Sequence, residues 1–139
     1  MPIQVEIISP EKVLFRREVE MAVMPGAEGD IAAMPDHAPM MLLLRGGVVS
    51  LYEGDRIVEQ FFVGGGFADM TPERCTILAD EALPVAEIKV DDARSRLQEL
   101  EIQFANVTAD DIAGQDKMSR RIQIARAEIE AAEVSHPTH

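Results

Sequence analysis

Glycine and proline are distributed very unevenly along this chain of 139 residues. Residues 1–84 contain eight of the nine Gly and seven of the eight Pro, whereas residues 85–139 contain only Gly114 and Pro137. Both residue types interrupt helices and are frequent in the turns that connect short strands. The distribution therefore predicts one domain boundary, at Pro84, with strands before it and helices after it.

Short apolar or β-branched runs recur before the boundary, separated by turn residues. Polar and apolar residues alternate over residues 4–7, as in a strand with one face in water, and residues 53–55 (Glu-Gly-Asp) are typical of a hairpin turn. This spacing predicts an all-β sandwich or barrel. The expected strands are residues 3–9, 13–16, 19–24, 30–34, 40–44, 48–52, 57–63, 67–70 and 75–79.

The apolar period after the boundary is that of a helix. Residues recur every three or four positions in two stripes: Ala93, Leu97, Leu100 and Phe104, then Met118, Ile122, Ala125, Ile129 and Ala132. Asp91 is expected to cap the first helix, and Thr108 with Asp110 or Asp111 the second. Because the connection over residues 106–115 is short, the pattern predicts an antiparallel two-helix hairpin on the β domain.

The charge balance argues against one class of partner. Thirteen Lys and Arg against twenty-five Asp and Glu give a formal net charge of -12, which repels a phosphate backbone. Nucleic acid is therefore not expected as a partner.

The longest apolar run, residues 38–44, is about a third of the roughly 20 residues that a membrane-spanning helix needs. We expect a chain that does not span the membrane and, without a leader pattern at its start, remains in the cytosol.

The search for chemistry is mostly negative. Cys75 is the only cysteine and reads as a small buried strand residue. Gly64 to Gly66 precede a strand pattern rather than a helix, so a bulge or close backbone approach is favoured over a phosphate cradle. His37 has no second His or Cys near it in sequence, and Pro137 prevents His136 and His139 from sharing a helix face. We expect no catalytic site and no metal site.

Several stretches, in order and over nearly the whole length, match one pattern. They are residues 5–10 with Phe15, 23–31 (VMPGAEGDI), 34–39 (MPDHAP), 64–67 (GGGF), 76–80 (TILAD) and the C-terminal hairpin. With these motifs the chain resembles the epsilon subunit of the bacterial F-type ATP synthase. The resemblance implies an N-terminal β-sandwich over residues 1–84, a helical hairpin over residues 85–139, and a place in the central stalk beside the gamma subunit and above the c ring.

The family's loop facing the c ring matches the turn at Glu28 and Asp30, with His37 nearby. The polar loops of the ring characteristically carry Arg, so the resemblance implies charge-assisted contacts with these carboxylates. The alternative is an ordinary acidic hairpin turn. The apolar run over residues 40–44 could similarly face the gamma subunit, or it could be buried in the sandwich.

In some members of the family the hairpin binds ATP through a motif of Ile or Leu, Asp, two variable residues, Arg and Ala. Residues 90–95 keep Asp91 and Arg94 but have Val and Ser at the outer positions. Arg126 on the second helix could supply a phosphate contact. The alternative is structural, with Asp91 capping the helix and pairing with Arg94, and Arg126 pairing with Glu130. Both interpretations stay open, and no other cofactor is implied.

The resemblance implies a non-catalytic rotor subunit that couples c-ring rotation to ATP synthesis, on the cytoplasmic face of the bacterial inner membrane. Its partners would be the gamma subunit and the c ring. Arg120, Arg121 and Arg126 would make transient contacts with the alpha and beta subunits when the hairpin regulates ATP hydrolysis. A free-standing nucleotide-sensing module is the alternative of a different class. An enzyme is disfavoured because no polar constellation supports one.

Overall fold

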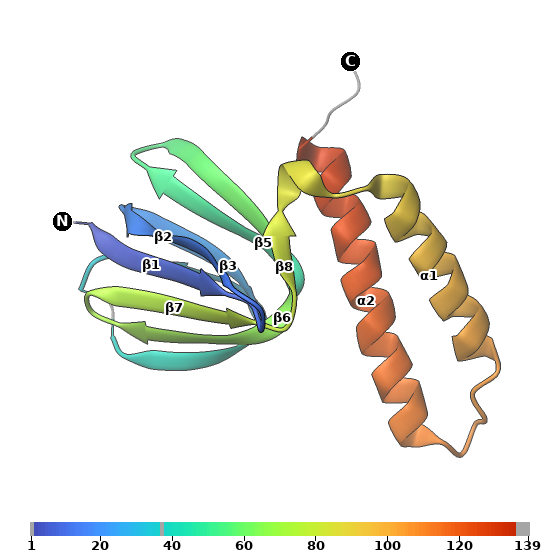
Figure 1. Cartoon of the computed structure of the whole chain (residues 1–139). Helices are drawn as coiled ribbons and strands as arrows, with labels where there is room; N and C mark the ends of the chain where they lie inside the picture. The colour runs from blue at the N-terminus through green and yellow to red at the C-terminus, as the bar shows by residue number, and fades with distance from the viewer. Residues whose placement is uncertain (1, 37, 136–139) are drawn as a thin grey trace.

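The computed structural model describes residues 2–36 and 38–135, which form a β domain followed by two helices (Figure 1). The predicted fold class is thereby confirmed: mainly strands, then a helical hairpin. β8 ends at Pro84, and no strand follows it among the described residues. The elements are β1 (Ile3–Ile8), β2 (Val13–Val19), β3 (Met21–Gly26), β4 (Gly29–Ala33), β5 (Met40–Glu53), β6 (Arg56–Thr71), β7 (Arg74–Ala79), β8 (Ala82–Pro84), the 3-10 helix η1 (Val85–Glu87), α1 (Val90–Ala105) and α2 (Ile112–Ser135).

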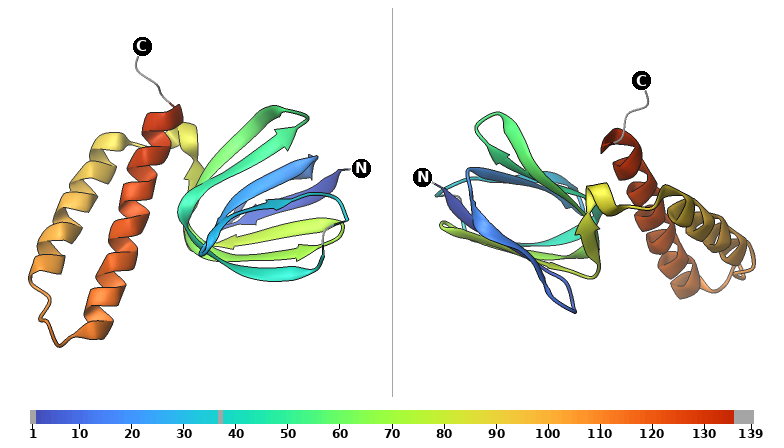
Figure 2. Two further views of the ribbon diagram at one scale, coloured as in Figure 1. Left: turned by 180° about the vertical axis from the view of Figure 1, so that it is seen from behind. Right: turned by 45° about the horizontal axis from the view of Figure 1, so that its top comes forward.

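The strands pair in the order β2-β1-β7-β6-β5-β3-β4, with β8 on β6. β1 and β7 are parallel, and the other pairs are antiparallel. β5 and β6 are long and curve from one layer of the sandwich to the other (Figures 1 and 2). Each was expected as two strands. The glycines between the expected strands, at 46–47 and 64–66, let the backbone bend without ending the ladder.

The glycine triplet shows the predicted close approach. Gly65 and Gly66 have φ of 94° and 126°, a region that favours glycine. Any Cβ on Gly66 would collide with the carbonyl oxygen of Leu78 on the neighbouring strand. Gly66 is therefore needed for the packing of β6 on β7.

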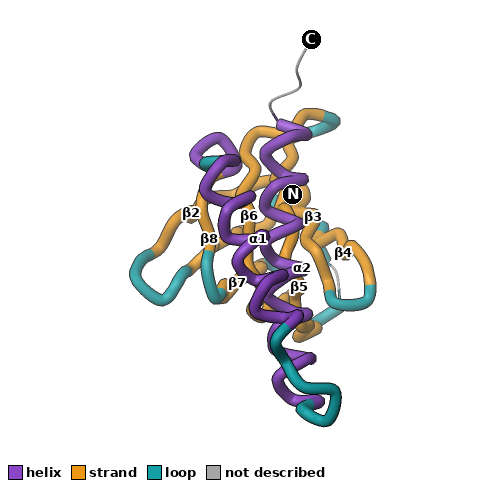
Figure 3. Tube along the Cα trace, turned by 90° about the vertical axis from the view of Figure 1, so that its right-hand side faces the viewer, coloured by secondary structure: helices purple, strands orange, loops and turns teal. Residues whose placement is uncertain are grey.

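The hairpin consists of α1 and α2 running antiparallel, as predicted (Figure 3). The cap predicted for α1 is wrong: the helix begins one residue before Asp91, with Lys89 at the N-cap and no side-chain cap hydrogen bond. Asp91 instead lies in the first turn, where its charge favours the helix dipole. For α2 the prediction of Asp111 is confirmed, because its Oδ1 accepts a hydrogen bond from the Gly114 N–H at 2.9 Å.

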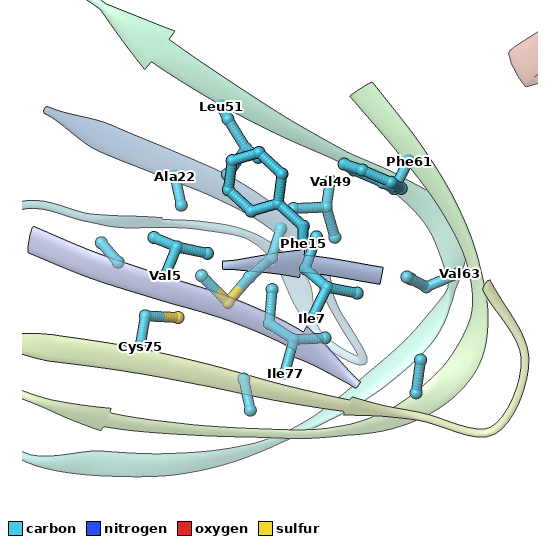
Figure 4. Packing of buried hydrophobic residues seen from close by; sticks show 14 of the residues in the cluster. Val5, Ile7, Phe15, Ala22, Val49, Leu51, Phe61, Val63, Cys75 and Ile77 are labelled. Atoms are coloured by element: carbon cyan, nitrogen blue, oxygen red, sulfur yellow. The ribbon is translucent and has the colours of Figure 1, made fainter. Parts of the chain in front are cut away.

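The core of the sandwich is filled by side chains from both layers (Figure 4). Phe15 and Phe61 meet edge to face, with ring centroids 5.5 Å apart. Cys75 is fully buried, as predicted, and burial with the nearby charge of Asp69 raises its thiol pKa to about 12. No residue of the described part of the hairpin belongs to this core. The buried members are Ile3, Val5, Ile7, Phe15, Val19, Ala22, Met24, Ala33, Leu44, Val49, Leu51, Phe61, Val63, Ala68, Met70, Cys75, Ile77 and Ala79.

A second, smaller cluster joins the hairpin to the sandwich. Helix α2 lies between the sandwich and α1 (Figures 1 and 2), so it carries the contact. At the middle of α2, the Gln123 amide forms two hydrogen bonds with the backbone of Gly46, at 2.8 and 3.0 Å. The buried members of the cluster are Phe62, Val85, Ile88, Ala131 and Ala132.

Candidate interaction surfaces

The acidic turn expected to face the c ring connects β3 to β4. Gly26 and Gly29 pair across the turn, and Gly29 has a φ of 139°. Glu28 and Asp30 are both exposed, so two carboxylates project from this edge of the sandwich. His37, the third residue expected at this interface, lies outside the described residues. The turn thus presents negative charge to solvent, and its contact with the c ring stays a prediction.

An apolar row crosses one outer face of the sandwich. Five residues on five neighbouring strands are directly paired: Leu43 with Phe67, Phe67 with Leu78, Leu78 with Ile8, and Ile8 with Val13. Paired residues in a sheet project to the same side. Their exposed fractions are 55 % for Leu43, 51 % for Phe67, 48 % for Leu78 and 44 % for Val13, while Ile8 is half-buried. A continuous apolar surface of this kind is typical of an interaction site.

The next row on the same face is polar except for Met41 at its β5 end. Met41 pairs with Asp69, Asp69 with Thr76, and Thr76 with Glu6, which forms an ion pair with Arg16 at 2.9 Å. The apolar row is therefore confined to one end of the face. Because these positions alternate along each strand, a polar neighbour two residues away marks the limit of the apolar surface.

The interpretation of residues 40–44 is resolved by alternation along β5. Leu44 is buried in the sandwich core and Leu42 packs against it, whereas Met41 and Leu43 are exposed. Burial in the sandwich is therefore confirmed for Leu42 and Leu44, whereas contact of the exposed Met41 and Leu43 with the gamma subunit stays a prediction. Sequence reasoning missed Phe67, Leu78 and Val13, although strand alternation in Ile77, Leu78 and Ala79 would have placed Leu78 outward.

The acidic turn and the apolar row adjoin each other. The Ala27 N–H, in the turn, donates a hydrogen bond to the Leu43 carbonyl oxygen at 2.8 Å. A groove of about 780 Å³, which Ala27 of the turn also lines, separates Leu43 and Phe67 from the first half of α2. Basic side chains of that helix line the groove: Lys117, Arg120 and Arg121. The apolar row thus has an acidic border and a basic border.

The candidate nucleotide residues are not gathered into one site. Arg94 lies 3.0 Å from Glu133, and Arg126 lies 3.3 Å from Glu101, so both guanidinium groups pair across the hairpin rather than with Asp91 or Glu130. Arg94 and Glu101 are seven residues apart on α1, about 10 Å along the helix axis. Only Arg126 of the three candidates lines the groove between the helices, whose volume is about 610 Å³. The pairs expected in the structural interpretation are therefore wrong, although both arginines do have structural partners, and nucleotide binding stays a prediction.

Two kinds of feature are absent from residues 2–36 and 38–135. Among them, no three His, Cys, Asp or Glu side chains lie together in a way that could hold a metal ion. Neither helix combines the length and the apolar character that crossing a membrane requires.

Comparison with known proteins gives a consistent family. Residues 2–85 match the family described as "ATP synthase, Delta/Epsilon chain, beta-sandwich domain". The ATP synthase epsilon chain of Gluconacetobacter diazotrophicus is 58 % identical over 132 residues, which cover 95 % of this chain and 94 % of the relative. The epsilon chain of Rhodospirillum rubrum is 45 % identical over 105 residues, covering 76 % and 78 %.

Solved structures share the fold at low identity. A chain in the mitochondrial ATP synthase of Euglena gracilis superposes with a TM-score of 0.75 at 22 % identity, covering 94 % of this chain and 81 % of that one. A chain of the central stalk and c-ring structure from Tetrahymena thermophila gives 0.69 at 15 % identity, covering 95 % and 97 %. Taken with the sandwich, the hairpin and the full-length identity above, these likenesses establish that the chain belongs to the family of bacterial F-type ATP synthase epsilon subunits.

Proposed function

We propose that this chain is a non-catalytic central-stalk subunit that couples rotation of the c ring to ATP synthesis. The observation that carries the proposal is the 58 % identity with an ATP synthase epsilon chain over 95 % of the sequence. The Tetrahymena neighbour belongs to a structure of the central stalk and c ring of a mitochondrial ATP synthase, which supports the same placement. The subunit would then lie peripherally on the cytoplasmic face of the membrane.

The apolar row is the surface that we assign to the gamma subunit. Leu43, Phe67, Leu78 and Val13 each keep about half of their surface in water. Covering the rest of such a side chain contributes on the order of 1 kcal/mol each. A partner that lies flat on the five strands would therefore gain several kcal/mol from this row alone, before any polar contact is counted.

The acidic turn is the surface that we assign to the c ring. Glu28 and Asp30 are exposed on a turn whose backbone is held by Gly29 and by the hydrogen bond from Ala27 to Leu43. Exposed carboxylates on a fixed turn can form charge-assisted hydrogen bonds with Arg side chains of a partner loop. Because the turn adjoins the apolar row, one subunit can contact gamma and the ring simultaneously.

The hairpin is the element that we assign to regulation. Lys117, Arg120 and Arg121 form a basic cluster on α2 of a chain with net charge -12. Such a cluster is drawn to acidic surface, which we place on the alpha and beta subunits. This contact is transient, because in the present conformation α2 packs on the sandwich through Phe62, Ala131 and Ala132.

Co-purification from solubilised membranes tests the proposal. The tagged chain is expected to bring down the gamma and c subunits, and a double variant, Leu43→Asp with Phe67→Asp, should lose gamma. Ile102→Asp is the matched control, because Ile102 is 59 % exposed on α1, away from the row. Thermal melting of all three proteins checks that each variant is folded, because half of the Leu43 and Phe67 surface is buried on the sheet.

Two results would contradict the proposal. If the tagged wild-type chain elutes alone, and membranes lacking it make ATP normally, the chain is not a rotor subunit. If the double variant retains gamma as well as the Ile102→Asp control does, the apolar row is not the gamma surface.

A further inference from the structure

Positive charges gather along one groove of this acidic chain. The groove of about 780 Å³ between the sandwich and the first half of α2 is lined by four exposed basic side chains, Arg45, Lys117, Arg120 and Arg121. None of the four forms an ion pair with a carboxylate of the described residues, whose ion pairs engage other arginines. Among the described residues that line the groove, Asp80 carries the only negative charge. The groove is therefore positive on a chain whose net charge is -12.

Apolar side chains line the same groove. Leu43 and Phe67, two members of the apolar row, lie along it on the sandwich side, and Ile124 lines it from α2. Gly46 and the glycine triplet of β6 also line it, and because they have no side chains the space beside them stays open. Figures 1 and 2 show α2 leaning away from the sandwich toward its N-terminal end. The groove thus has an apolar wall on the sandwich and a basic wall on α2.

This lining favours a ligand that is both acidic and apolar. Carboxylates form charge-assisted hydrogen bonds with guanidinium and ammonium groups. Leu43 is 55 % exposed and Phe67 51 % exposed, so apolar groups of a ligand would gain by covering them. Side chains of an extended peptide point alternately to opposite sides. A segment with alternating acidic and apolar residues would therefore meet both walls of the groove.

We propose that this groove binds an acidic, partly apolar segment of the partner that covers the apolar row. The inference rests on the proposed function, in which that partner is the gamma subunit. Because Leu43 and Phe67 belong both to the row and to the groove, one partner reaches both surfaces without a break. A segment in the groove contacts the sandwich and α2 together, so it holds the hairpin in the docked position.

The bound segment also competes with the regulatory contact. Lys117, Arg120 and Arg121 are the side chains that the proposed function assigns to the alpha and beta subunits when the hairpin leaves the sandwich. While these cations face a segment in the groove, they do not contact another acidic surface. Occupation of the groove and contact of α2 with alpha and beta therefore oppose each other, each weakening the other by the same factor.

Chemical labelling of lysine tests the proposal on the full chain. Lysine occurs only at positions 12, 89 and 117, and all three side chains are exposed. Lys117 lines the groove, whereas Lys89, at the N-cap of α1, lies outside both the groove and the row. An amine-reactive reagent is applied to the chain alone and to its purified complex with gamma. The reactivity of Lys117 should fall severalfold in the complex, with Lys89 as the internal control.

A set of charge variants tests the same contact by affinity. Replacing Lys117, Arg120 and Arg121 together by Gln should weaken gamma binding about tenfold at low ionic strength and reduce its dependence on salt. The matched control replaces Arg56, Arg74 and Lys89 by Gln, which removes as many exposed cations outside the groove. Gamma should slow amide exchange in α2 of the control but not of the groove variant.

The outcomes separate this proposal from the proposed function. A chain that does not bind gamma at all overturns both. A gamma complex in which Lys117 stays as reactive as in the free chain, or in which the groove variant binds as tightly as the control, overturns the groove alone. Vesicles of phosphatidylglycerol are the probe for a different occupant, since anionic lipid also attracts basic side chains. Protection of Lys117 by these vesicles and not by gamma would show that the groove faces a membrane surface, against the proposal.

Discussion

Two neighbouring phenylalanines on β6 offer a direct test of how the two parts of this chain are held together. Phe61 is 3 % exposed and lies in the sandwich core, against Phe15. Phe62 is fully buried, but on the opposite face of the strand, in the cluster that the hairpin covers. Replacing each by Ala therefore removes the same side chain from two different interfaces.

The expected magnitudes follow from the burial of each ring. Phe to Ala substitutions at fully buried sites cost about 3–5 kcal/mol. For Phe61→Ala this cost should fall on the folding of the sandwich itself. For Phe62→Ala it should fall on docking of the hairpin, which lowers the docking constant by roughly two to three and a half powers of ten. In a chain truncated after Val85, the hairpin residues that pack on Phe62 are absent and its side chain is exposed. Phe62→Ala should then change the free energy of unfolding by no more than about 0.5 kcal/mol.

Urea unfolding of the full and truncated chains, each with either variant, measures these costs. The truncated chain should unfold cooperatively, because its core contains no hairpin residue among those described. Phe61→Ala should destabilise both lengths, and Phe62→Ala should increase amide exchange in α2 of the full chain while leaving the truncated chain unchanged. If Phe62→Ala destabilises the truncated chain as much as Phe61→Ala does, or if the truncated chain shows no cooperative transition, the hairpin belongs to the folding core and the argument is wrong.

Three further predictions concern the surfaces and the core. Replacing Glu28 and Asp30 together by Lys should weaken ATP-driven proton pumping in membrane vesicles without affecting the fold, since both are exposed turn residues; unchanged pumping with normal incorporation would exclude the turn from the interface. An assembly with the chain truncated after Val85 should still synthesise ATP, with ATPase activity level or raised, and a fall in ATPase activity would show that the hairpin does not act as a brake. Because burial raises the pKa of Cys75 from 9.0 to about 12, the unfolded thiol ionises first as the pH rises, so about 1 kcal/mol of stability should be lost between about pH 9 and pH 10. Urea midpoints of the wild type and Cys75→Ala over this range measure that loss, and equal losses in both proteins would contradict it.

The sequence predicted which segments form strands and which form helices more accurately than the residues at which these begin and end. The periods on either side of Pro84 indicated strands and helices correctly because they reflect which face of each element is buried. The cap of α1 was misplaced at Asp91 because Lys89 takes the extended N-cap conformation, so helix boundaries depend on backbone geometry that residue preferences only bias. The four strands predicted over residues 40–44, 48–52, 57–63 and 67–70 are in fact two long strands, β5 and β6. The glycines within them bend the strand instead of ending it, as glycine does in a turn.

The candidate surfaces divide in the same way. The acidic turn was found from sequence because its residues are adjacent in the chain. The apolar row was found only in part, since it is assembled from five strands and includes the parallel pairing of Ile8 with Leu78, seventy residues apart. In the structural alternative the partners of Arg94 and Arg126 lie on the same helix as each arginine, whereas the observed partners both lie across the hairpin. An arginine on one helix can pair with a carboxylate on the same helix or with one on the neighbouring helix. The sequence alone does not show which carboxylates of the second helix lie within reach.

What the sequence by itself determined is the division at Pro84, the secondary structure on each side, the exposed acidic turn and the family. These features depend on local periodicity, on turn chemistry and on motifs that are continuous in the chain. Only the tertiary structure decided which exposed apolar side chains form one surface, that Gln123 contacts Gly46, and that Arg96 pairs with Glu128. Each of these contacts joins residues distant in sequence, and strand register and helix docking, which fix such contacts, are set by burial of the whole core rather than by any local segment.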